Sequence, residues 1–249
     1  VTRGACDPQR RMRVILLDDC FTTFQEPHIG RAAVAVLERM GYAVELAGVC
    51  CGRAMISKGF LTDARDVARR GVRRLAKAAA DGVPVLGLEP SCVLTLADEW
   101  PELVPGPQAK AVAAAAELAE AWVVRQVGDS GVSLDVSPHS GKAVFHPHCH
   151  QRALVGAAGT AAALKLVPGL DVTVLDAGCC GMAGAFGYEK EHFDVSLRIA
   201  NLQLAPALAA APDAVVVATG TSCRHQIRDA TGRHAVHPME LLAGAASPS

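Results

Sequence analysis

The sequence of 249 residues has little of what marks several large classes of protein. Aromatic residues make up 4% of it, and the formal net charge at pH 7 is −1. A protein that binds nucleic acid would carry a strongly basic face, so we expect no nucleic-acid partner. No run of 18 apolar residues occurs, because Glu117 and Glu120 interrupt the apolar stretch 111–124. We therefore expect no transmembrane segment.

Signals for secretion and for nucleotide binding are absent as well. The sequence opens with no charged region followed by an apolar one, so no secretory route is visible and we expect a cytoplasmic protein. The first expected strand, 14–17, runs into Asp18-Asp19-Cys20-Phe21, where a dinucleotide-binding fold would carry Gly-x-Gly. The four-cysteine runs of bacterial ferredoxins are missing too. We expect neither a dinucleotide nor a ferredoxin-type cluster on this chain.

What the chain does contain is nine cysteines, eight of which fall into two matching sets. In each set a single cysteine precedes an adjacent pair by 30 positions, glycine follows the pair, and a last cysteine comes 41 or 43 positions later. The second set repeats the first after 129 to 131 residues, and only Cys6 is left over. We call these sets frames: the first frame is Cys20, Cys50, Cys51 and Cys92, and the second is Cys149, Cys179, Cys180 and Cys223.

Metal binding is the interpretation that explains a repeated frame. Disulfides stabilise small secreted scaffolds, whereas this chain has 51% hydrophobic residues and is long enough to form a core without them. Simple burial explains isolated free cysteines but not a repeated spacing. Sets of four thiolates suit zinc or an iron–sulfur cluster. Adjacent cysteines reach different irons of a cluster more easily than one tetrahedral ion, so the pattern favours iron–sulfur and leaves zinc open.

Short apolar runs alternate with amphipathic stretches along the chain, and this alternation predicts an α/β fold. Strands that alternate with helices form parallel sheets with right-handed connections, so we expect two tandem Rossmann-like repeats. The expected strands are 14–17, 44–47, 83–88, 143–146, 172–175 and 214–218, and the expected helices are 27–40, 61–80, 108–126, 150–166 and 190–210.

Every frame cysteine follows the end of an expected strand. In open α/β sheets, ligands bind beyond the carboxyl ends of the strands, so each frame should gather at one edge of its sheet. Gly52 and Gly181, which follow the cysteine pairs, would let the backbone turn tightly beside the ligands. The sequence therefore predicts one metal site in each half.

The repeat also suggests a division of the chain into domains. We expect a polar lead-in over 1–12 and a first cysteine-rich repeat with a trailing helix over 13–127. A linker rich in Asp, Ser, Gly and Pro follows over 128–141. A second cysteine-rich repeat covers 142–242, and 243–249 form a tail.

Four strings around the frames carry a family resemblance over residues 13–240. They are Gly178-Cys179-Cys180-Gly181-Met182-Ala183-Gly184, His146-Pro147-His148-Cys149-His150, Thr219-Gly220-Thr221-Ser222-Cys223 and Glu89-Pro90-Ser91-Cys92. The chain resembles the cysteine-rich, or CCG, domain family. That family includes the B subunit of heterodisulfide reductase and the iron–sulfur subunits of glycolate oxidase, lactate-utilisation and anaerobic glycerol-3-phosphate dehydrogenase systems. It also forms the C-terminal part of fused FAD-linked oxidases of D-2-hydroxy acids, which the last string resembles most.

The resemblance implies an iron–sulfur electron-transfer module, of the [4Fe-4S] type, in an oxidoreductase for D-lactate, glycolate or D-2-hydroxyglutarate. Its FAD and its ferredoxin-type clusters would lie on another domain or subunit, so the chain would not be catalytically complete alone. Through such partners it would associate with the inner face of the membrane. The alternative is a zinc-binding structural module of a redox complex.

One departure from the family bears on the cofactor. Members with a noncubane [4Fe-4S] cluster end each frame with Cys-x-x-Cys and supply five thiolates. Here Glu89 and Gly220 stand three positions before the last cysteines, so each frame offers four. A noncubane cluster and disulfide-reducing chemistry are therefore not expected, whereas a four-cysteine cluster, or zinc in one half, stays open.

Other side chains near the frames are secondary candidates. Glu89 would act as an oxygen ligand in place of a thiolate, or as a capping carboxylate beside the ligands. Histidines near the second frame would bind metal, carry protons or donate hydrogen bonds to sulfur, or they belong to a polar loop at a strand end. These histidines are His139, His146, His148, His150 and His225, of which His148 and His150 are the ligand candidates.

Overall fold

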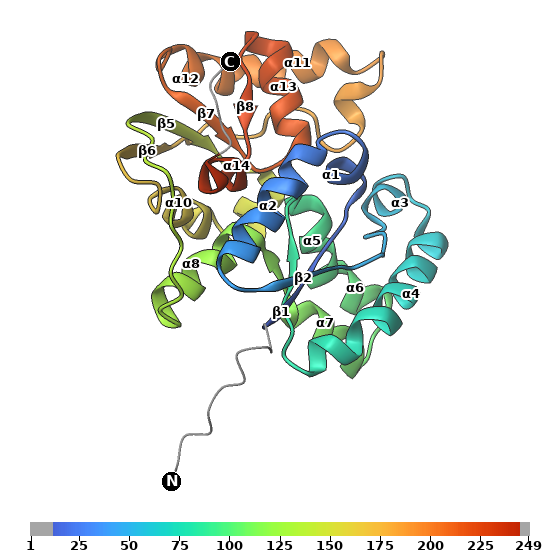
Figure 1. The fold of residues 1–249 in the computed structure, drawn as a ribbon. Coiled ribbons are helices and arrows are strands. Elements are labelled where there is room, and N and C mark those ends of the chain that lie inside the picture. Colours follow the sequence, from blue (N-terminus) through green and yellow to red (C-terminus); the bar gives the residue numbers. More distant parts are fainter. Residues whose placement is uncertain (1–11, 245–249) are drawn as a thin grey trace.

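The computed structural model describes residues 12–244 and contains two four-stranded sheets in which every strand pair is parallel (Figure 1). The strand orders are β2-β1-β3-β4 and β6-β5-β7-β8, so the second sheet repeats the first. The predicted α/β class with two Rossmann-like repeats is confirmed. We call residues 12–129 the first half and residues 130–244 the second half. Cys6 lies outside the described residues.

The first half forms one sheet and the helices that cover it. Its strands are β1 (Arg13–Leu16), β2 (Ala43–Leu46), β3 (Val85–Gly87) and β4 (Ala116–Leu118). Its helices are α1 (Cys20–Phe24), α2 (Pro27–Arg39), α3 (Arg53–Ser57), α4 (Leu61–Ala80), α5 (Pro90–Ala97), α6 (Glu99–Leu103), α7 (Pro107–Ala115) and α8 (Ala119–Asp129).

The second half repeats this plan. Its strands are β5 (Gly141–His146), β6 (Leu170–Val174), β7 (Val215–Ala218) and β8 (Ala235–Val236). Its helices are α9 (Cys149–Leu154), α10 (Ala158–Leu164), the 3₁₀ turn η1 (Phe186–Tyr188), α11 (Phe193–Leu202), α12 (Leu204–Ala209), α13 (Thr221–Thr231) and α14 (Pro238–Ala243). No helix within residues 12–244 has the length and apolar character needed to cross a membrane.

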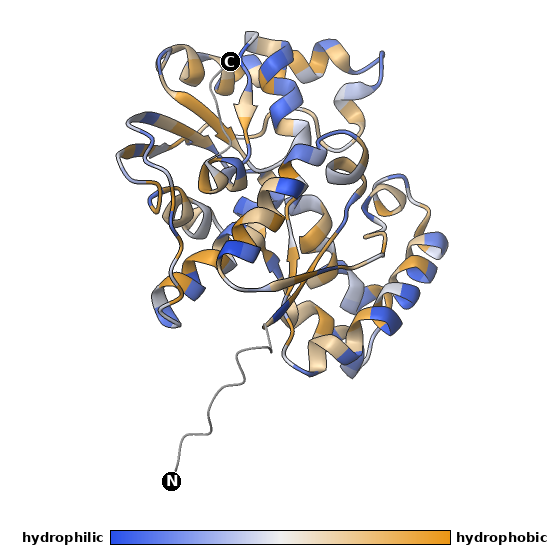
Figure 2. Cartoon of the chain, in the orientation of Figure 1, coloured by the Kyte–Doolittle hydropathy of each residue, from blue (hydrophilic) through white to orange (hydrophobic). Residues whose placement is uncertain are grey.

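Helix α4 shows how residue type fixes an element and the face that it buries. Its apolar positions recur at helical spacing, and Ala68, Val72 and Leu75 are buried on that stripe against the first sheet. The arginines of α4 lie on the opposite, hydrophilic face, which Figure 2 shows turned outward. The predicted helix 61–80 coincides with α4. The spacing of its apolar and charged residues is a local feature, so it predicts the helix without reference to neighbouring elements.

The last helix of each half packs on the other half. α8, the last helix of the first half, packs on α10 of the second, and α14, the last helix of the second half, packs on α2 of the first (Figure 1). At these contacts Arg39 Nη2 donates to the carbonyl oxygen of Leu242 at 2.8 Å, and Thr160 Oγ1 donates to Glu120 Oε1 at 2.9 Å. One buried apolar cluster contains side chains of all four helices and of both sheets. The halves therefore share a core.

The predicted helix over 108–126 is wrong in its middle. The structure has α7, then the short strand β4, then α8. Alanine is the strongest helix former, so an alanine-rich stretch gives no local sign of a strand. Ala116 and Leu118 pair in parallel register with Val85 and Gly87 of β3 and are buried there. Pairing with β3 overrides the helix propensity of this segment.

Two other predicted helices are each divided in the structure. The helix expected over 150–166 is interrupted after α9, where Gly156 adopts φ of +73°. The helix expected over 190–210 breaks at Gln203, close before Pro206, whose ring removes a helical N–H and disfavours an uninterrupted helix. The short helix α1, which begins at Cys20, and strand β8 were not expected.

The segment expected to link the repeats contains residues 130–140, which form neither helix nor strand. α8 extends two residues into the expected range, and β5 begins at its last residue. Val136 is buried in the shared core, so this segment is packed against the body of the protein.

Candidate metal centre

The cysteines of both frames follow the carboxyl ends of the parallel strands, and half of them lie in the first turn of a helix. Cys20 and Cys149 are the first residues of α1 and α9, and Cys92 and Cys223 are the third residues of α5 and α13. A helix N-terminus carries roughly half a positive charge, which favours a thiolate over a thiol. At Cys20 and Cys92, burial and nearby carboxylates outweigh this effect and raise the pKa, and at Cys149 a hydrogen bond to Cys179 and burial raise it. Of these four thiols, only that of Cys223 has a lowered pKa.

The adjacent cysteine pairs lie in the loops that follow β2 and β6, and a glycine makes the turn after each pair. Gly52 has φ of +82° and Gly181 has φ of +95°, both in the left-handed region. A Cβ atom at Gly181 would also lie 2.4 Å from the carbonyl oxygen of Ser196. The predicted tight turns are confirmed, and at these positions a larger residue would be strained.

In the first frame the two buried thiols are in contact. Cys51 Sγ donates to Cys92 Sγ at 3.2 Å, while Cys50 contacts Cys51 and is itself close to Cys20. The indole Nε1 of Trp100, a fully buried side chain, donates to the carbonyl oxygen of Cys51 at 2.9 Å. This bond fixes the loop that carries the cysteine pair. The structure thus brings the four predicted thiols of the first half together.

In the second frame the four thiols form a continuous series of contacts. The thiols of Cys149 and Cys180 both hydrogen-bond to Cys179, and Cys180 also contacts Cys223. The backbone N–H of Gly181 donates to Cys179 Sγ at 3.3 Å. Cys180 and Cys223 are buried, whereas the other two cysteines are exposed. The frame is thus partly open to an incoming group.

Negative charge surrounds the first frame. Burial raises the pKa of Cys20, and the nearby carboxylate of Asp19 raises it further. The hydrogen bond from Cys51 lowers the pKa of Cys92, but burial and the charges of Glu89 and Asp19 outweigh it, so the pKa is raised overall. In this frame the thiols alone resist ionisation, and a bound cation would offset the negative charge.

The pKa values of the second-frame thiols are shifted in both directions. The hydrogen bonds that Cys149 and Cys180 donate to Cys179, together with burial, raise the pKa of each of these two thiols. Hydrogen bonds from Cys149 and Cys180 lower the pKa of Cys179, and the His146 ring lowers it further. The pKa of Cys223 is lowered by a hydrogen bond from Cys180 and, despite burial, by His148 and His146. Imidazoles thus stand beside the second frame where carboxylates stand beside the first.

Glu89 joins the two halves through the helix termini that carry Cys92 and Cys223. Its Oε1 atom accepts from the backbone N–H of Ser91 at 3.2 Å and from the Ser91 hydroxyl at 2.7 Å. Its Oε2 atom accepts from the backbone N–H of Thr221 at 2.8 Å. Both oxygens are therefore engaged by the first turns of α5 and α13. Of the two roles expected for Glu89, these contacts favour that of a capping carboxylate.

The two candidate histidine ligands occupy different positions. His148 caps α9, because its Nδ1 atom accepts from the backbone N–H of His150 at 3.2 Å. Its ring fills the space where a side chain at Gly220 would lie, since a Cβ there would be 2.3 Å from His148 Cδ2. His150 Nε2 lies 3.5 Å from Arg53 Nη1 and 3.8 Å from Glu99 Oε1, so it faces the first half.

The remaining histidines divide between the site and the opposite edge of the sheet. His146 ends β5 and faces the second frame. His139 precedes β5, and its backbone N–H bonds to Pro168 O at 2.9 Å, which places it at the amino end of the strands, away from the cysteines. His225 Nδ1 lies 2.7 Å from the hydroxyl oxygen of Tyr188.

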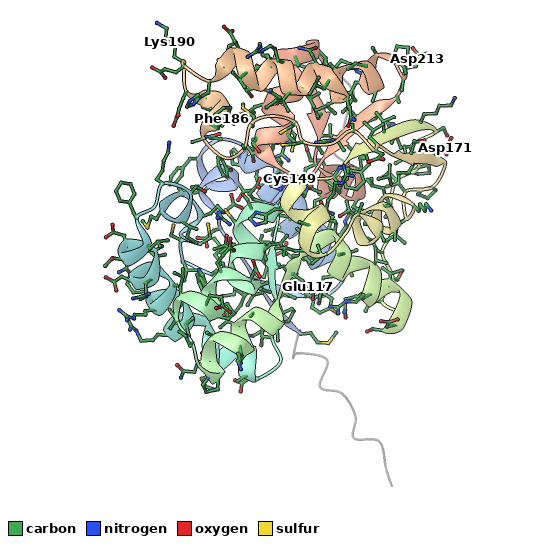
Figure 3. All side chains as sticks on the ribbon, turned by 180° about the vertical axis from the view of Figure 1, so that it is seen from behind. Glu117, Cys149, Asp171, Phe186, Lys190 and Asp213 are labelled. Carbon is green, nitrogen blue, oxygen red and sulfur yellow. The ribbon has the colours of Figure 1, made fainter. Side chains whose placement is uncertain are left out.

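Several residues at the boundary between the halves were missed by the sequence analysis. Arg53, next to the first cysteine pair, is ion-paired with Glu99. Arg224, next to Cys223, donates two hydrogen bonds to the carboxylate of Glu26; burial raises the pKa of this carboxyl, but Arg224 outweighs burial and lowers it to about 2. Only the positions of Arg53 and Arg224 beside the frames could have suggested a role. Figure 3 shows Cys149 near the middle of the molecule, where the halves meet.

The thiols fit a thiophilic metal group by their chemistry. Within residues 12–244, no three His, Cys, Asp or Glu side chains are already grouped around a single point as ligands of one metal ion. Each frame instead presents four thiols joined by pairwise contacts, two of them buried. Soft thiolates in sets of four are the donors of iron–sulfur clusters and of thiolate zinc sites.

Comparison with protein-family models finds one match, to the cysteine-rich domain called CCG. The model matches the chain twice, over residues 14–97 and residues 143–228. Each matched segment runs from the first strand of its half to the helix that carries the last frame cysteine.

Curated proteins similar to this chain are named as dehydrogenase components or as a lactate-utilisation protein. The chain is 33% identical over 245 residues to a subunit of the anaerobic glycerol-3-phosphate dehydrogenase of Escherichia coli (strain K12), covering 97% of this chain and 61% of that protein. It is 30% identical over 239 residues to D-2-hydroxyglutarate dehydrogenase of Pantoea ananatis (strain AJ13355), covering 95% of this chain and 23% of that protein. It is 31% identical over 196 residues to lactate utilization protein A of Macrococcus caseolyticus (strain JCSC5402), covering 74% of this chain and 76% of that protein.

Proposed function

Because the chain belongs to the cysteine-rich (CCG) domain family, we propose that it is the iron–sulfur electron-transfer module of an FAD-linked oxidoreductase that acts on a 2-hydroxy acid. D-lactate, glycolate and D-2-hydroxyglutarate are the substrates proposed for the complete enzyme. The chain spans only 61% of the glycerol-3-phosphate dehydrogenase subunit and 23% of the D-2-hydroxyglutarate dehydrogenase, so this activity needs parts that those relatives carry beyond the matched region.

The observation that carries the proposal is the repeated gathering of four thiols at the carboxyl edge of a parallel sheet. We assign one metal group to the first frame, Cys20, Cys50, Cys51 and Cys92. We assign another to the second frame, Cys149, Cys179, Cys180 and Cys223. An iron–sulfur cluster, when bound, supplies one-electron transfer without proton chemistry of its own.

The side chains around the frames then have distinct tasks. The helix N-termini under Cys20, Cys92, Cys149 and Cys223 add partial positive charge that would help to stabilise thiolates once a metal is bound. Trp100 holds the Cys51 loop, and the Glu89 carboxylate fixes the first turns of α5 and α13 relative to each other. These contacts keep both frames at a constant separation, which electron transfer between them requires.

We place the flavin and any ferredoxin-type cluster on a partner domain or subunit. Removal of a hydride from a 2-hydroxy acid needs a cofactor able to take it, and the strand that would carry a nucleotide loop ends instead in Asp18-Asp19-Cys20. Cys20, Cys50, Cys149 and Cys179 are exposed, so a partner could reach both frames. We place this assembly in the cytoplasm, where its partners would bring it to the inner face of the membrane.

The test is chemical analysis of the full chain purified without oxygen. We expect iron and acid-labile sulfide together with a broad absorption band at about 400 nm. The chain alone, incubated with D-lactate, glycolate or D-2-hydroxyglutarate and a dye acceptor, should show no turnover. A colourless protein that contains zinc would contradict the proposal and support the alternative of a structural module. Substrate oxidation without an added flavoprotein would contradict the placement of the flavin.

The alternative zinc function is favoured by one feature, the environment of the first frame. There the carboxylates of Asp19 and Glu89 and the four thiols are close together, and a divalent cation would offset their charge. Zinc in the first frame with iron in the second would be seen as both metals in the same preparation.

A further inference from the structure

His146 is a buried side chain whose ring makes no well-formed hydrogen bond among the described residues. It is the last residue of β5 and is 1% exposed. Neither Nδ1 nor Nε2 has a partner with hydrogen-bond geometry, and the interaction of the ring with the Cys223 sulfur, toward which it acts as a donor, lacks that geometry too. An unpaired buried polar group costs about 1–3 kcal/mol, so native structures rarely keep one without a reason.

The orientation of His146 follows from its position in the strand. Side chains alternate between the two faces of a strand, so His146 shares a face with Val144 and not with Phe145. Phe145 lies in the core shared by the two halves, whereas Val144 lies in the cluster that contains Cys180 and Cys223. The imidazole is therefore directed to the second frame, and it is close enough to Cys223 to influence its ionisation.

The internal repeat provides a comparison within the same molecule. His146 precedes Cys149 by three positions, and Leu17 precedes Cys20 by three positions. Leu17 is also 1% exposed and belongs to the apolar cluster that contains Cys51 and Cys92. The same buried position beside the cysteines is thus filled by an apolar side chain in the first frame and by a metal-binding side chain in the second.

His148 differs from His146 in what its nitrogens do. Its Nδ1 atom accepts the N–H of His150, and a neutral imidazole that accepts at one nitrogen carries its proton on the other. Its Nε2 atom is then a donor and has no lone pair for a metal. His146 accepts no backbone N–H, so either nitrogen can carry the ring proton and the other can present a lone pair to the frame.

We propose that His146 is a nitrogen ligand of the metal group in the second frame, in place of one of the thiolates of Cys149, Cys179, Cys180 and Cys223. This inference rests on the proposed function, because it needs a metal in the second frame. A [4Fe-4S] cubane or a tetrahedral zinc ion takes four protein ligands, so the second site then has three sulfur donors and one nitrogen donor, whereas the first has sulfur alone. A neutral imidazole in place of a thiolate removes a negative charge, and histidine ligation raises the potential of iron–sulfur centres relative to cysteine ligation.

Pulsed electron paramagnetic resonance (EPR) on the full chain tests the inference. The chain is produced with ¹⁵N-labelled histidine, purified without oxygen, and measured both oxidised and after one-electron reduction. The signal of the second frame is the one lost in Cys180→Ser. We expect that signal to show strong coupling to ¹⁵N, as for a directly bound nitrogen. If metal analysis finds zinc, X-ray absorption at the zinc edge replaces the EPR measurement. A nitrogen neighbour is then expected beside the sulfurs.

Three variants assign the nitrogen. His146→Leu, which copies Leu17, should lose the coupling, whereas His148→Gln and His150→Gln should keep it. Should His146→Leu fail to fold by circular dichroism, the double variant His148→Gln/His150→Gln replaces it and must still show the coupling.

The outcomes separate the two proposals. A cluster signal without nitrogen coupling, or coupling that survives in His146→Leu, overturns the ligand role of His146 and leaves the proposed function standing. A wild-type chain with no metal in the second frame overturns the proposed function and the ligand role together.

Discussion

The carboxylate of Glu89 accepts a hydrogen bond from the backbone N–H of Thr221 at 2.8 Å, across the boundary between the two halves. Glu89 belongs to the helix start that carries Cys92, and Thr221 begins the helix that carries Cys223. One side chain thus fixes the first turns of two helices that each present a frame thiol. We therefore expect the geometry of the two frames to be linked through Glu89.

Replacement of Glu89 tests this link. Glu89→Ala removes the acceptor from two helix N-termini, and at about 1 kcal/mol for each cap we expect a loss of roughly 2 kcal/mol in the free energy of unfolding. Glu89→Gln keeps one acceptor oxygen, so its free energy of unfolding should lie between those of the wild type and of Glu89→Ala. Urea denaturation measures both, with the exposed Glu102→Ala as control. Equal stability of Glu89→Ala and Glu102→Ala would contradict the capping role.

Single cysteine changes should affect one frame at a time. Cys51→Ser weakens a donor in the first frame only, so we expect the metal content to fall to about half, since binding depends on the full set of deprotonated ligands. Cys180→Ser is the matched change in the second frame and should remove the other half. Metal and sulfide analysis after anaerobic purification measures both. If either variant lost all metal, or none, two independent sites would be ruled out.

The packing of Trp100 on α4 should be sensitive to a single methyl group. A Cβ atom at Gly71 would lie 2.0 Å from Trp100 Cη2, so Gly71→Ala must displace the indole that holds the Cys51 loop. We expect a destabilisation of about 1–3 kcal/mol, measured by urea denaturation, and weaker metal retention in the first frame. Gly128→Ala is the control, because a Cβ atom there meets nothing within 4 Å and should stabilise α8. Similar effects of the two changes would speak against this packing argument.

Glu120 should make stability fall as the pH rises. Burial raises its pKa to about 7, although Thr160 donates to its Oε1 atom. Since the folded pKa lies above the unfolded one, the stability is fully present below about pH 4.5 and is lost as the pH rises through 7. The loss amounts to roughly 3 kcal/mol. Glu120→Gln should remove most of this dependence between pH 5 and pH 8.

Urea midpoints at several pH values measure the effect of Glu120. The exposed Glu102→Gln serves as control for the removal of a carboxylate and should leave the pH profile unchanged. A wild-type midpoint that rises between pH 5 and pH 8, with Glu120→Gln following the same curve, would show that Glu120 is not the group responsible.

The two frames should differ in reduction potential. Asp19 places negative charge beside the first frame, whereas His146 and His148 stand beside the second. Glu89 lies between the two frames and does not distinguish them. Negative charge disfavours the addition of an electron, so the second frame should have the higher potential. Asp19→Asn keeps an acceptor for α1 and should raise the potential of the first frame alone. A redox titration followed by electron paramagnetic resonance measures both; a higher potential in the first frame would refute the argument.

Local patterns were enough to predict most of the strands that precede the cysteines, but not the helices α1, α5 and α13 that carry three of them. The apolar and polar spacing of 61–80 gave α4 with its bounds, and the short run 143–146 lies within β5. The repeated spacing of the thiols, combined with the rule that ligands bind at the carboxyl ends of strands, predicted which four cysteines gather in each half. The family resemblance that these strings carry is confirmed.

What the sequence could not give depends on contacts between distant residues. β4 is a strand because Ala116 meets Val85, and nothing in an alanine-rich stretch signals that partner. Glu26 and Arg224 pair over 198 positions, so neither sequence neighbourhood points to the other. The lack of a partner for His146 is likewise a property of the packed interior and is invisible in the string of letters around it.

The packing of α8 and α14, each on the other half, has a consequence for the stability of a single half. A single half in its present form would expose the apolar faces that now meet in the shared core, and it would not be stable alone in water. α2 meets α14 in the same way as α10 meets α8, so the contact is self-complementary, as in a dimer with twofold symmetry. Two copies of one half would pack in this arrangement, whether separate or joined in one chain. Joined in one chain, the two copies can differ, as they do at Leu17 and His146 beside the cysteines.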